Sequence, residues 1–314
     1  MAIILDDRES EIFVVKIASV DCEGGTFLGT LRLRYHNSRS SLIYMPIMHS
    51  LALPATQSER LQQGLTDIRL IAADIDGTLT SGGKFTPQLL QAIDLLNAKD
   101  IKLLLVTGRS AGWVSAVNNY LPVAGAIAEN GGVYFVGVAS QNENRDCSGF
   151  DFITRLEDIE SHRAELANRF WELQELYPQI EESSDNQFRL TDWTFDVAGL
   201  TDVELADIAI RCQQWGYSFT FSTVQCHIKP QHQDKGAAIL QVMKLYFPEL
   251  TPAQIITVGD SPNDTTMFDR ELFLHSVGVA NIQHYTTQLT HRPKYITQLS
   301  EVAGFCELVN LLVE

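Results

Sequence analysis

The chain has 314 residues, 45% of them hydrophobic and 20% charged, which is typical of a globular protein with roughly two domains. Its net charge of −16 and its pI near 4.9 speak against nucleic acids and anionic membranes as partners, because a field of that sign repels both. The same field would repel a phosphorylated substrate unless a metal ion and local cations reverse the charge at the site.

The cysteines and the apolar runs predict a cytoplasmic location. The five cysteines are scattered and form no C-x-x-C pair, which fits a reduced compartment better than a disulfide framework. No apolar run approaches the ~20 residues of a membrane span. The acidic start of the chain does not resemble a secretory signal.

Residues 1–67 are expected to form a small β-rich extension. Its apolar runs at 12–17, 31–35 and 42–47 are separated by turns rich in glycine or serine, and residues 50–67 read as a linker. The extension either packs on the main domain or serves dimerisation or partner binding. The oligomeric state, monomer or homodimer, stays open.

From residue 68 onward, short apolar strands alternate with amphipathic helices, which predicts an α/β fold with a parallel sheet. The strand 70–73 ends abruptly in Asp74 and Asp76, two carboxylates that would share a face of an extended strand. A second strand ends at Thr107, and a third leads into the turn 129–132. Ligands of open α/β sheets bind at such carboxyl ends.

Between two parts of this core, the order of the expected elements changes to α-β-β-α-β-β, which predicts an inserted α+β cap. The expected domains are a first core part (68–140), the cap (141–223) and a second core part (224–314). The expected cap elements are helices at 156–177 and 202–215, a hairpin of 188–191 with 194–197, and strands at 217–221 and 224–228. Trp193 and the other cap aromatics are expected in the cap core rather than on a sugar-binding surface.

The second core part adds two more sets of polar residues. Asp234 can cap a helix that begins at Lys235, and an apolar strand at 255–258 ends in Asp260 and Asp264. Because the carboxyl ends of parallel strands meet at one edge of a sheet, we expect these residues to converge with Asp74.

Four segments, in this order, resemble the four motifs of the haloacid dehalogenase superfamily. They are Asp74-Ile75-Asp76-Gly77-Thr78-Leu79, Val106-Thr107-Gly108-Arg109, Asp234-Lys235-Gly236 and Gly259-Asp260-Ser261-Pro262-Asn263-Asp264. The cap between the second and third motifs, together with Glu129-Asn130-Gly131-Gly132, resembles the type IIB, Cof-like branch, which includes archaeal-type phosphoglycolate phosphatase and sugar-phosphate phosphatases. The resemblance covers residues 68–314 and implies a Rossmannoid core with an inserted cap.

The resemblance implies a Mg²⁺-dependent phosphatase that acts on a small phosphorylated metabolite. Asp74 would be the nucleophile that forms an aspartyl-phosphate, and Asp76 the acid and base that serves the leaving alcohol and then water. Mg²⁺ would bind Asp74, the backbone carbonyl of Asp76 and Asp260, while Asp264 would coordinate directly or orient the bound waters. Lys235 would add positive charge at a helix N-terminus.

Further residues are candidates for binding the substrate. Thr107 and the backbone N–H of Gly108 would hydrogen-bond a phosphoryl oxygen, while Arg109 forms either a salt bridge or a substrate contact. Arg189, on the first strand of the expected hairpin, could clamp a second anionic group or form a surface ion pair. Asn130 is a candidate for contacting the leaving group, and His227, on a strand that runs toward the site, is a candidate for contacting the substrate.

Two rival hypotheses use the same residues. A phosphomutase would return the phosphoryl group to a second hydroxyl instead of releasing phosphate. A non-catalytic module would only sense a phosphorylated metabolite, with residues 1–67 recruiting a partner.

Overall fold

The computed structural model describes residues 12–16, 30–34, 65, 67–137, 149–222 and 224–314. The chain divides into two compact units, Met1–Leu51 and Ala52–Glu314. In the first unit β1 (Ile12–Lys16) pairs antiparallel with β2 (Thr30–Arg34), which confirms two of the expected strands. The expected strand at 42–47 and almost all of the linker at 50–67 lie outside the described residues.

The second unit is built on an eight-stranded sheet of order β13-β12-β11-β3-β4-β5-β6-β7. Pairing is parallel from β13 to β5 and antiparallel from β5 to β7, which confirms the α/β fold. The strands are β3 (Leu70–Ala73), β4 (Lys102–Val106), β5 (Gly125–Ala128), β6 (Val133–Val136), β7 (Phe150–Phe152), β11 (Ile255–Gly259), β12 (His275–Gly278) and β13 (Tyr295–Ile296).

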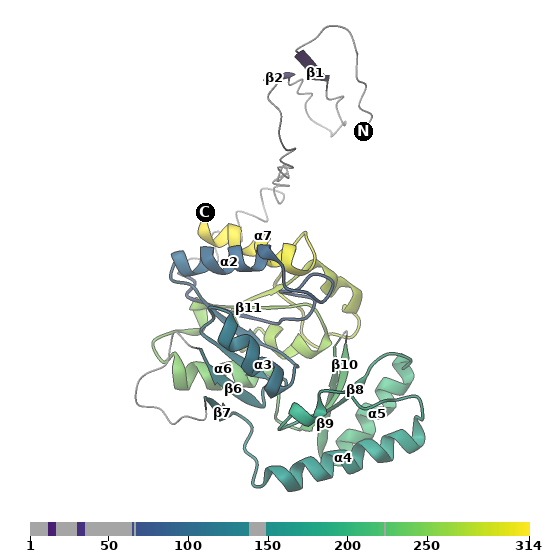
Figure 1. Ribbon diagram of the computed structural model, residues 1–314. Helices are drawn as coiled ribbons and strands as arrows, with labels where there is room; N and C mark the ends of the chain where they lie inside the picture. Colours follow the sequence, from purple (N-terminus) through teal and green to yellow (C-terminus); the bar gives the residue numbers. More distant parts are fainter. Residues whose placement is uncertain (1–11, 17–29, 35–64, 66, 138–148, 223) are drawn as a thin grey trace. The chain divides into compact units, whose positions relative to one another are not determined.

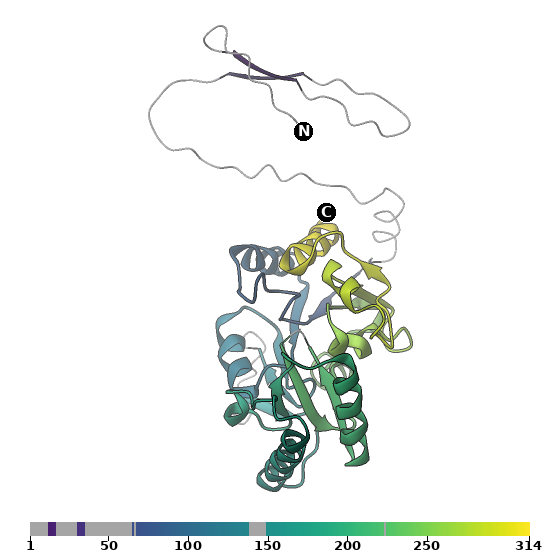
Figure 2. The same ribbon diagram turned by 90° about the vertical axis from the view of Figure 1, so that its right-hand side faces the viewer.

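Helices cover both faces of this sheet (Figures 1 and 2). One apolar core lies under α2 (Pro87–Ala98), α3 (Ala111–Tyr120) and α7 (Glu301–Val313), and the other lies under α6 (Lys235–Tyr246) and the 3₁₀ segment η4 (Pro262–Phe268). Strand β3 is fully buried because Ile71 and Ala73 enter the first core while Leu70 and Ala72 enter the second. The short apolar strands predicted from the sequence therefore form the middle layer.

The cap has its own sheet and its own core. Strand β10 (Gln225–Pro230) lies between β8 (Trp193–Asp196) and β9 (Tyr217–Phe221) and pairs antiparallel with both. Helices α4 (Ile159–Leu176) and α5 (Asp202–Gln214) pack on this sheet (Figure 1), and the buried Trp193 belongs to their core, as predicted. A capping box between Thr201 and Glu204 sets the start of α5.

The expected hairpin of 188–191 with 194–197 is wrong in its first strand. A 3₁₀ turn, η2 (Asn186–Phe188), ends where that strand was expected to begin, and residues 189–191 form no strand. The Asn186 side chain pairs with the backbone of Thr194 through both its amide nitrogen and its oxygen. The backbone neighbour of β8 on this side is the segment 181–183, which forms an isolated antiparallel bridge between Glu182 and Phe195. The alternation of apolar and polar residues at 188–191 is not a signature of pairing here.

Strand pairing also departs from the expected domain ranges. Strand β7 lies within 141–223 but extends the core sheet. Strand β10, expected as a cap element at 224–228, is the middle strand of the cap sheet, so the cap extends beyond its expected boundary at 223. Residue periodicity identifies a strand without identifying its neighbour, which depends on the tertiary fold. Among the described residues, no helix combines the length and the apolar character that crossing a membrane requires.

Candidate active site

Four predicted residues meet where β3 and β11 end. These strands are parallel neighbours, so Asp74 and Asp260 leave the sheet side by side. The Lys235 ammonium, at the first residue of α6, lies 2.5 Å from Asp74 Oδ1 and 2.5 Å from Asp264 Oδ1. Carboxylate oxygens of Asp74, Asp260 and Asp264 all lie within 4.8 Å of one another. The convergence expected from strand order is present.

Burial shifts the pKa values of the charged groups in this cluster. Burial alone would lower the pKa of Lys235, but Asp264 and Asp74 outweigh it and hold that pKa above its usual value. Burial, reinforced by Asp264 and Asp76, raises the pKa of Asp74 to about 7 although Lys235 opposes the shift. Burial, together with Asp74 and Asp264, likewise raises the pKa of Asp260 well above its usual value. One ammonium does not balance three buried carboxylates.

This imbalance fits a cation site made of oxygen ligands. A buried group of carboxylates is stable in its ionised form only when cations or hydrogen bonds compensate the charge. The loop after β3 also closes tightly on the cluster: a Cβ atom on Gly77, which has φ of +82°, would lie 2.4 Å from Asp260 Oδ2. Only glycine allows this approach. The described residues therefore include a buried aspartate cluster that could hold a metal ion.

Hydrogen bonds hold the two carboxylates of the fourth motif. Asp264 Oδ2 accepts the backbone N–H groups of Asp260 and Ser261, at 2.9 and 3.0 Å. Asp260 accepts the Thr78 hydroxyl at 3.2 Å and the Asn281 amide at 2.8 Å. The sequence analysis missed Asn281, because nothing in the sequence connects the segment after β12 to the Asp260 loop.

Asp76 is engaged by Arg109 in this conformation. The guanidinium donates from Nε to one carboxylate oxygen at 2.8 Å and from Nη2 to the other at 2.6 Å. This paired geometry realises the salt-bridge alternative that the sequence left open for Arg109. The guanidinium also lies over the Trp113 ring, 5.5 Å from its centroid.

The predicted phosphate loop and the turn after β5 lie side by side. Thr107 is buried, and its hydroxyl accepts the backbone N–H of Arg109 at 3.1 Å. The backbone N–H of Asn130 donates to the carbonyl of Thr107 at 2.9 Å, and Asn130 Oδ1 accepts from Asn263 Nδ2 at 3.1 Å. The first, second and fourth sequence segments therefore meet at one pocket, which Asp74 and Asp76 line together with Thr107, Gly108 and Asn263.

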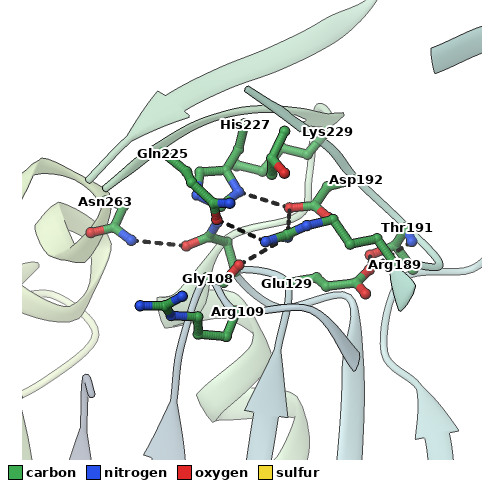
Figure 3. A network of polar contacts seen from close by, with 12 residues as sticks. Gly108, Arg109, Glu129, Arg189, Thr191, Asp192, Gln225, His227, Lys229 and Asn263 are labelled. Atoms are coloured by element: carbon green, nitrogen blue, oxygen red, sulfur yellow. Dashed lines mark hydrogen bonds and ion pairs between the residues drawn. The ribbon is translucent and has the colours of Figure 1, made fainter. Parts of the chain in front are cut away.

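Arg189 is neither a surface residue nor part of a hairpin strand. It is 2% exposed and follows η2. Its five N–H groups are directed at Asp185, Asp192, the carbonyl of Gly108 and the side chain of Gln225, as Figure 3 shows for the last three. The expected surface ion pair is wrong, and in this conformation the guanidinium keeps no free donor to clamp a substrate anion.

His227 lies on β10 and lines the pocket from the cap side. Its Nδ1 lies 2.8 Å from Asp192 Oδ2. Burial lowers the pKa of His227, and the nearby Asp192 only partly offsets this effect.

Glu129 joins the cap to the core, a role that the sequence analysis did not assign. Its buried carboxylate accepts the backbone N–H groups of Ala111 in the core and of Leu190 and Thr191 in the cap, at 2.7–3.1 Å, and also the Thr191 hydroxyl. Burial and the nearby Asp192 raise the pKa of Glu129. The sequence signal that could have indicated this role is the position of Glu129 directly after the wholly apolar strand β5.

Comparisons with known proteins agree with this geometry. A family model described as sucrose-6F-phosphate phosphohydrolase matches residues 68–310. A phosphoglycolate phosphatase of Sulfolobus acidocaldarius is 30% identical over 217 residues, which make up 68% of this chain and 82% of that relative.

Two solved structures share the fold. A Thermoplasma acidophilum protein superposes with a TM-score of 0.58 at 20% identity, covering 78% of this chain and 99% of its own. The sucrose-phosphatase of Synechocystis, solved with sucrose and phosphate, superposes with a TM-score of 0.54 at 16% identity, covering 78% of this chain and 98% of its own.

These findings confirm the superfamily and the enzyme class expected from the four motifs. Because the family model spans well over half of the chain, the protein belongs to the sucrose-6F-phosphate phosphohydrolase family and is a phosphatase of the haloacid dehalogenase superfamily.

Proposed function

We propose that the protein is a Mg²⁺-dependent phosphatase that hydrolyses a small phosphorylated metabolite, of the sugar-phosphate or phosphoglycolate class, through an aspartyl-phosphate on Asp74. The observation that carries the proposal is that only one oxygen of the Asp74 carboxylate has a hydrogen-bond partner among the described residues. Lys235 holds its Oδ1, while none of the described residues donates a hydrogen bond to Oδ2. Asp74 also lines the pocket, so a free oxygen at the end of a central strand is available for attack.

Two displacements at phosphorus would complete the reaction. In the first, Asp74 Oδ2 forms a bond to phosphorus, the ester P–O bond breaks, and Asp76 gives its proton to the leaving oxygen. In the second, Asp76 takes a proton from water, the water oxygen attacks phosphorus, and inorganic phosphate leaves Asp74. Asp76 serves these steps only after it exchanges its ion pair with Arg109 for contact with the leaving group.

The phosphoryl oxygens would be held by groups that already face the pocket. Thr107 would donate its hydroxyl hydrogen, assisted by the backbone N–H of Gly108. Lys235 would hold Asp74 in place and supply positive charge, without which the acidic protein would repel the substrate.

Mg²⁺ suits the donor set because the side-chain ligands are all carboxylate oxygens. Asp74, Asp260 and the backbone carbonyl of Asp76 would hold it. Asp264 already accepts the Lys235 ammonium on Oδ1 and two backbone N–H groups on Oδ2, whereas each oxygen of Asp260 accepts a single neutral side-chain donor. This difference favours the orienting role for Asp264. When bound, Mg²⁺ would neutralise charge on the transferring phosphoryl group.

The test is the release of inorganic phosphate from p-nitrophenyl phosphate with Mg²⁺ present. We expect Asp74→Asn to abolish turnover, because an amide oxygen is a poor nucleophile. Asp94→Asn, the same exchange at an exposed position of α2, is the matched control and should retain full activity. Unchanged turnover by Asp74→Asn would refute the proposal. Transfer to a second hydroxyl without phosphate release would instead support the phosphomutase alternative.

A further inference from the structure

Among the described residues, the cap wall of the pocket is mostly polar and carries no fixed positive charge. The cap residues that line it are Ser222, Val224, Gln225 and His227. Arg189 lies behind this wall with all its N–H groups engaged. The part of the leaving group that faces the cap would therefore meet hydrogen-bonding groups instead of a cation that attracts a carboxylate.

The imidazole of His227 is held in one tautomer. Its Nδ1 faces Asp192 Oδ2 at 2.8 Å, and Arg189 Nη1 reaches both oxygens of Asp192, at 2.9 and 3.1 Å (Figure 3). Burial opposes ionisation of Asp192, but Arg189 and His227 outweigh it and lower the pKa of this carboxylate. An ionised carboxylate only accepts hydrogen bonds, so Nδ1 carries the hydrogen and Nε2 keeps its lone pair. None of the described residues bonds to Nε2.

A hydrogen-bond donor without a partner lies next to this acceptor. Asn130 is 1% exposed, and its Nδ2 has no hydrogen-bond partner among the described residues. The bond from Asn263 Nδ2 to Asn130 Oδ1 fixes the orientation of the amide. Asn130 Nδ2 and His227 Nε2 are neighbours above Gly108, since each lies 3.1 Å from the place where a Cβ atom on that residue would stand.

We propose that His227 and Asn130 form a pair that recognises a hydroxyl group of the substrate's leaving alcohol, with Asp192 as the positioning residue for His227. A hydroxyl can donate to Nε2 and accept from Nδ2 at once, whereas a carboxylate can only accept and would place its lone pairs against that of Nε2. The pair therefore favours phosphate esters of polyhydroxylated alcohols, such as sugars, over phosphoglycolate. This inference rests on the proposed phosphatase function and deepens it.

Three two-carbon substrates isolate the hydroxyl: 2-hydroxyethyl phosphate, ethyl phosphate and phosphoglycolate. We expect wild-type kcat/KM to be about 10-fold higher for 2-hydroxyethyl phosphate than for ethyl phosphate, because one well-placed hydrogen bond has about that effect. Phosphoglycolate should be the poorest of the three. In His227→Phe, the ratio of hydroxyethyl to ethyl phosphate should fall to about 1.

The role of Asp192 has a readout that does not depend on turnover. Nitrogen-15 NMR of labelled histidine should show His227 with hydrogen on Nδ1 in the wild type and a mixture of tautomers in Asp192→Asn. That variant should also lose most of the hydroxyl preference. Asp196→Asn, the same exchange at an exposed position of β8, should change neither.

Failure of the inference and failure of the proposed function are distinguishable. A wild-type ratio near 1, a preference for phosphoglycolate, or an unchanged tautomer in Asp192→Asn would overturn the inference while turnover persists. Absence of Mg²⁺-dependent turnover with all three substrates and with p-nitrophenyl phosphate would overturn the proposed function itself.

Discussion

Replacement of Lys235 by methionine tests the electrostatic account of the site. The substitution keeps a long, flexible side chain but removes the charge that lies 2.5 Å from both Asp74 and Asp264. Lys235 is fully buried, so water cannot take over its role. Removing one partner of a buried ion pair costs about 3–5 kcal/mol, because the other partner stays buried without compensation.

Thermal unfolding at pH 8 with a chelator present measures this cost. For a domain of this size, 1 kcal/mol corresponds to a shift of about 2–4 °C, so the melting temperature should fall by roughly 6–20 °C. Added Mg²⁺ should recover part of the loss, because a cation can compensate the same carboxylates. Lys244→Met, at an exposed position of the same helix, is the control. A stability of Lys235→Met within about 1 kcal/mol of that control would refute the reasoning.

Three further predictions concern other parts of the site. Asp76→Asn should lower kcat/KM, which reports the steps up to departure of the leaving group, by about 10²–10⁴ for ethyl phosphate but much less for p-nitrophenyl phosphate, whose leaving group needs no proton. Equal losses in kcat/KM would contradict the acid role. Glu129→Gln should speed hydrogen exchange at the Leu190 and Thr191 amides by about 10–100-fold, because it weakens bonds worth about 1–3 kcal/mol; unchanged exchange would show that Glu129 does not hold the cap. Burial raises the pKa of Asp74 to about 7, so the folded metal-free protein keeps a proton that the unfolded chain has lost above pH ~4. The stability of the metal-free protein should therefore fall as pH rises from ~4 to ~7. The Mg²⁺ affinity measured by calorimetry should rise over pH 6–8, because the proton on Asp74 competes with the metal. A flat affinity profile would contradict the shift.

The sequence was most informative where local chemistry and sheet topology agree. The apolar strand before Asp74 predicted where β3 ends, and the Asp234 cap predicted that α6 begins at Lys235. Because parallel strands end at a common edge of the sheet, these two features also predicted the edge at which the site lies.

The cap–core contacts were not predictable in the same way. The pairing of Asp76 with Arg109, and of Glu129 with the backbone N–H groups at 190 and 191, joins residues whose sequence separation carries no periodic signal. Arg189 misled for another reason: its neighbours alternate like a strand, but the ion pairs to Asp185 and Asp192, four residues before and three after it, favour a turn. Such contacts depend on where the cap packs against the core.

The central claim is that Asp74 carries the phosphoryl group during turnover. The most direct measurement is borohydride trapping during turnover with Mg²⁺, followed by mass spectrometry of the peptide that contains Asp74, because borohydride reduces an acyl phosphate to the alcohol. We predict homoserine at position 74 in the wild type during turnover and none without substrate. Steady phosphate release with an unmodified Asp74, or with the reduced residue at another position, would contradict the account.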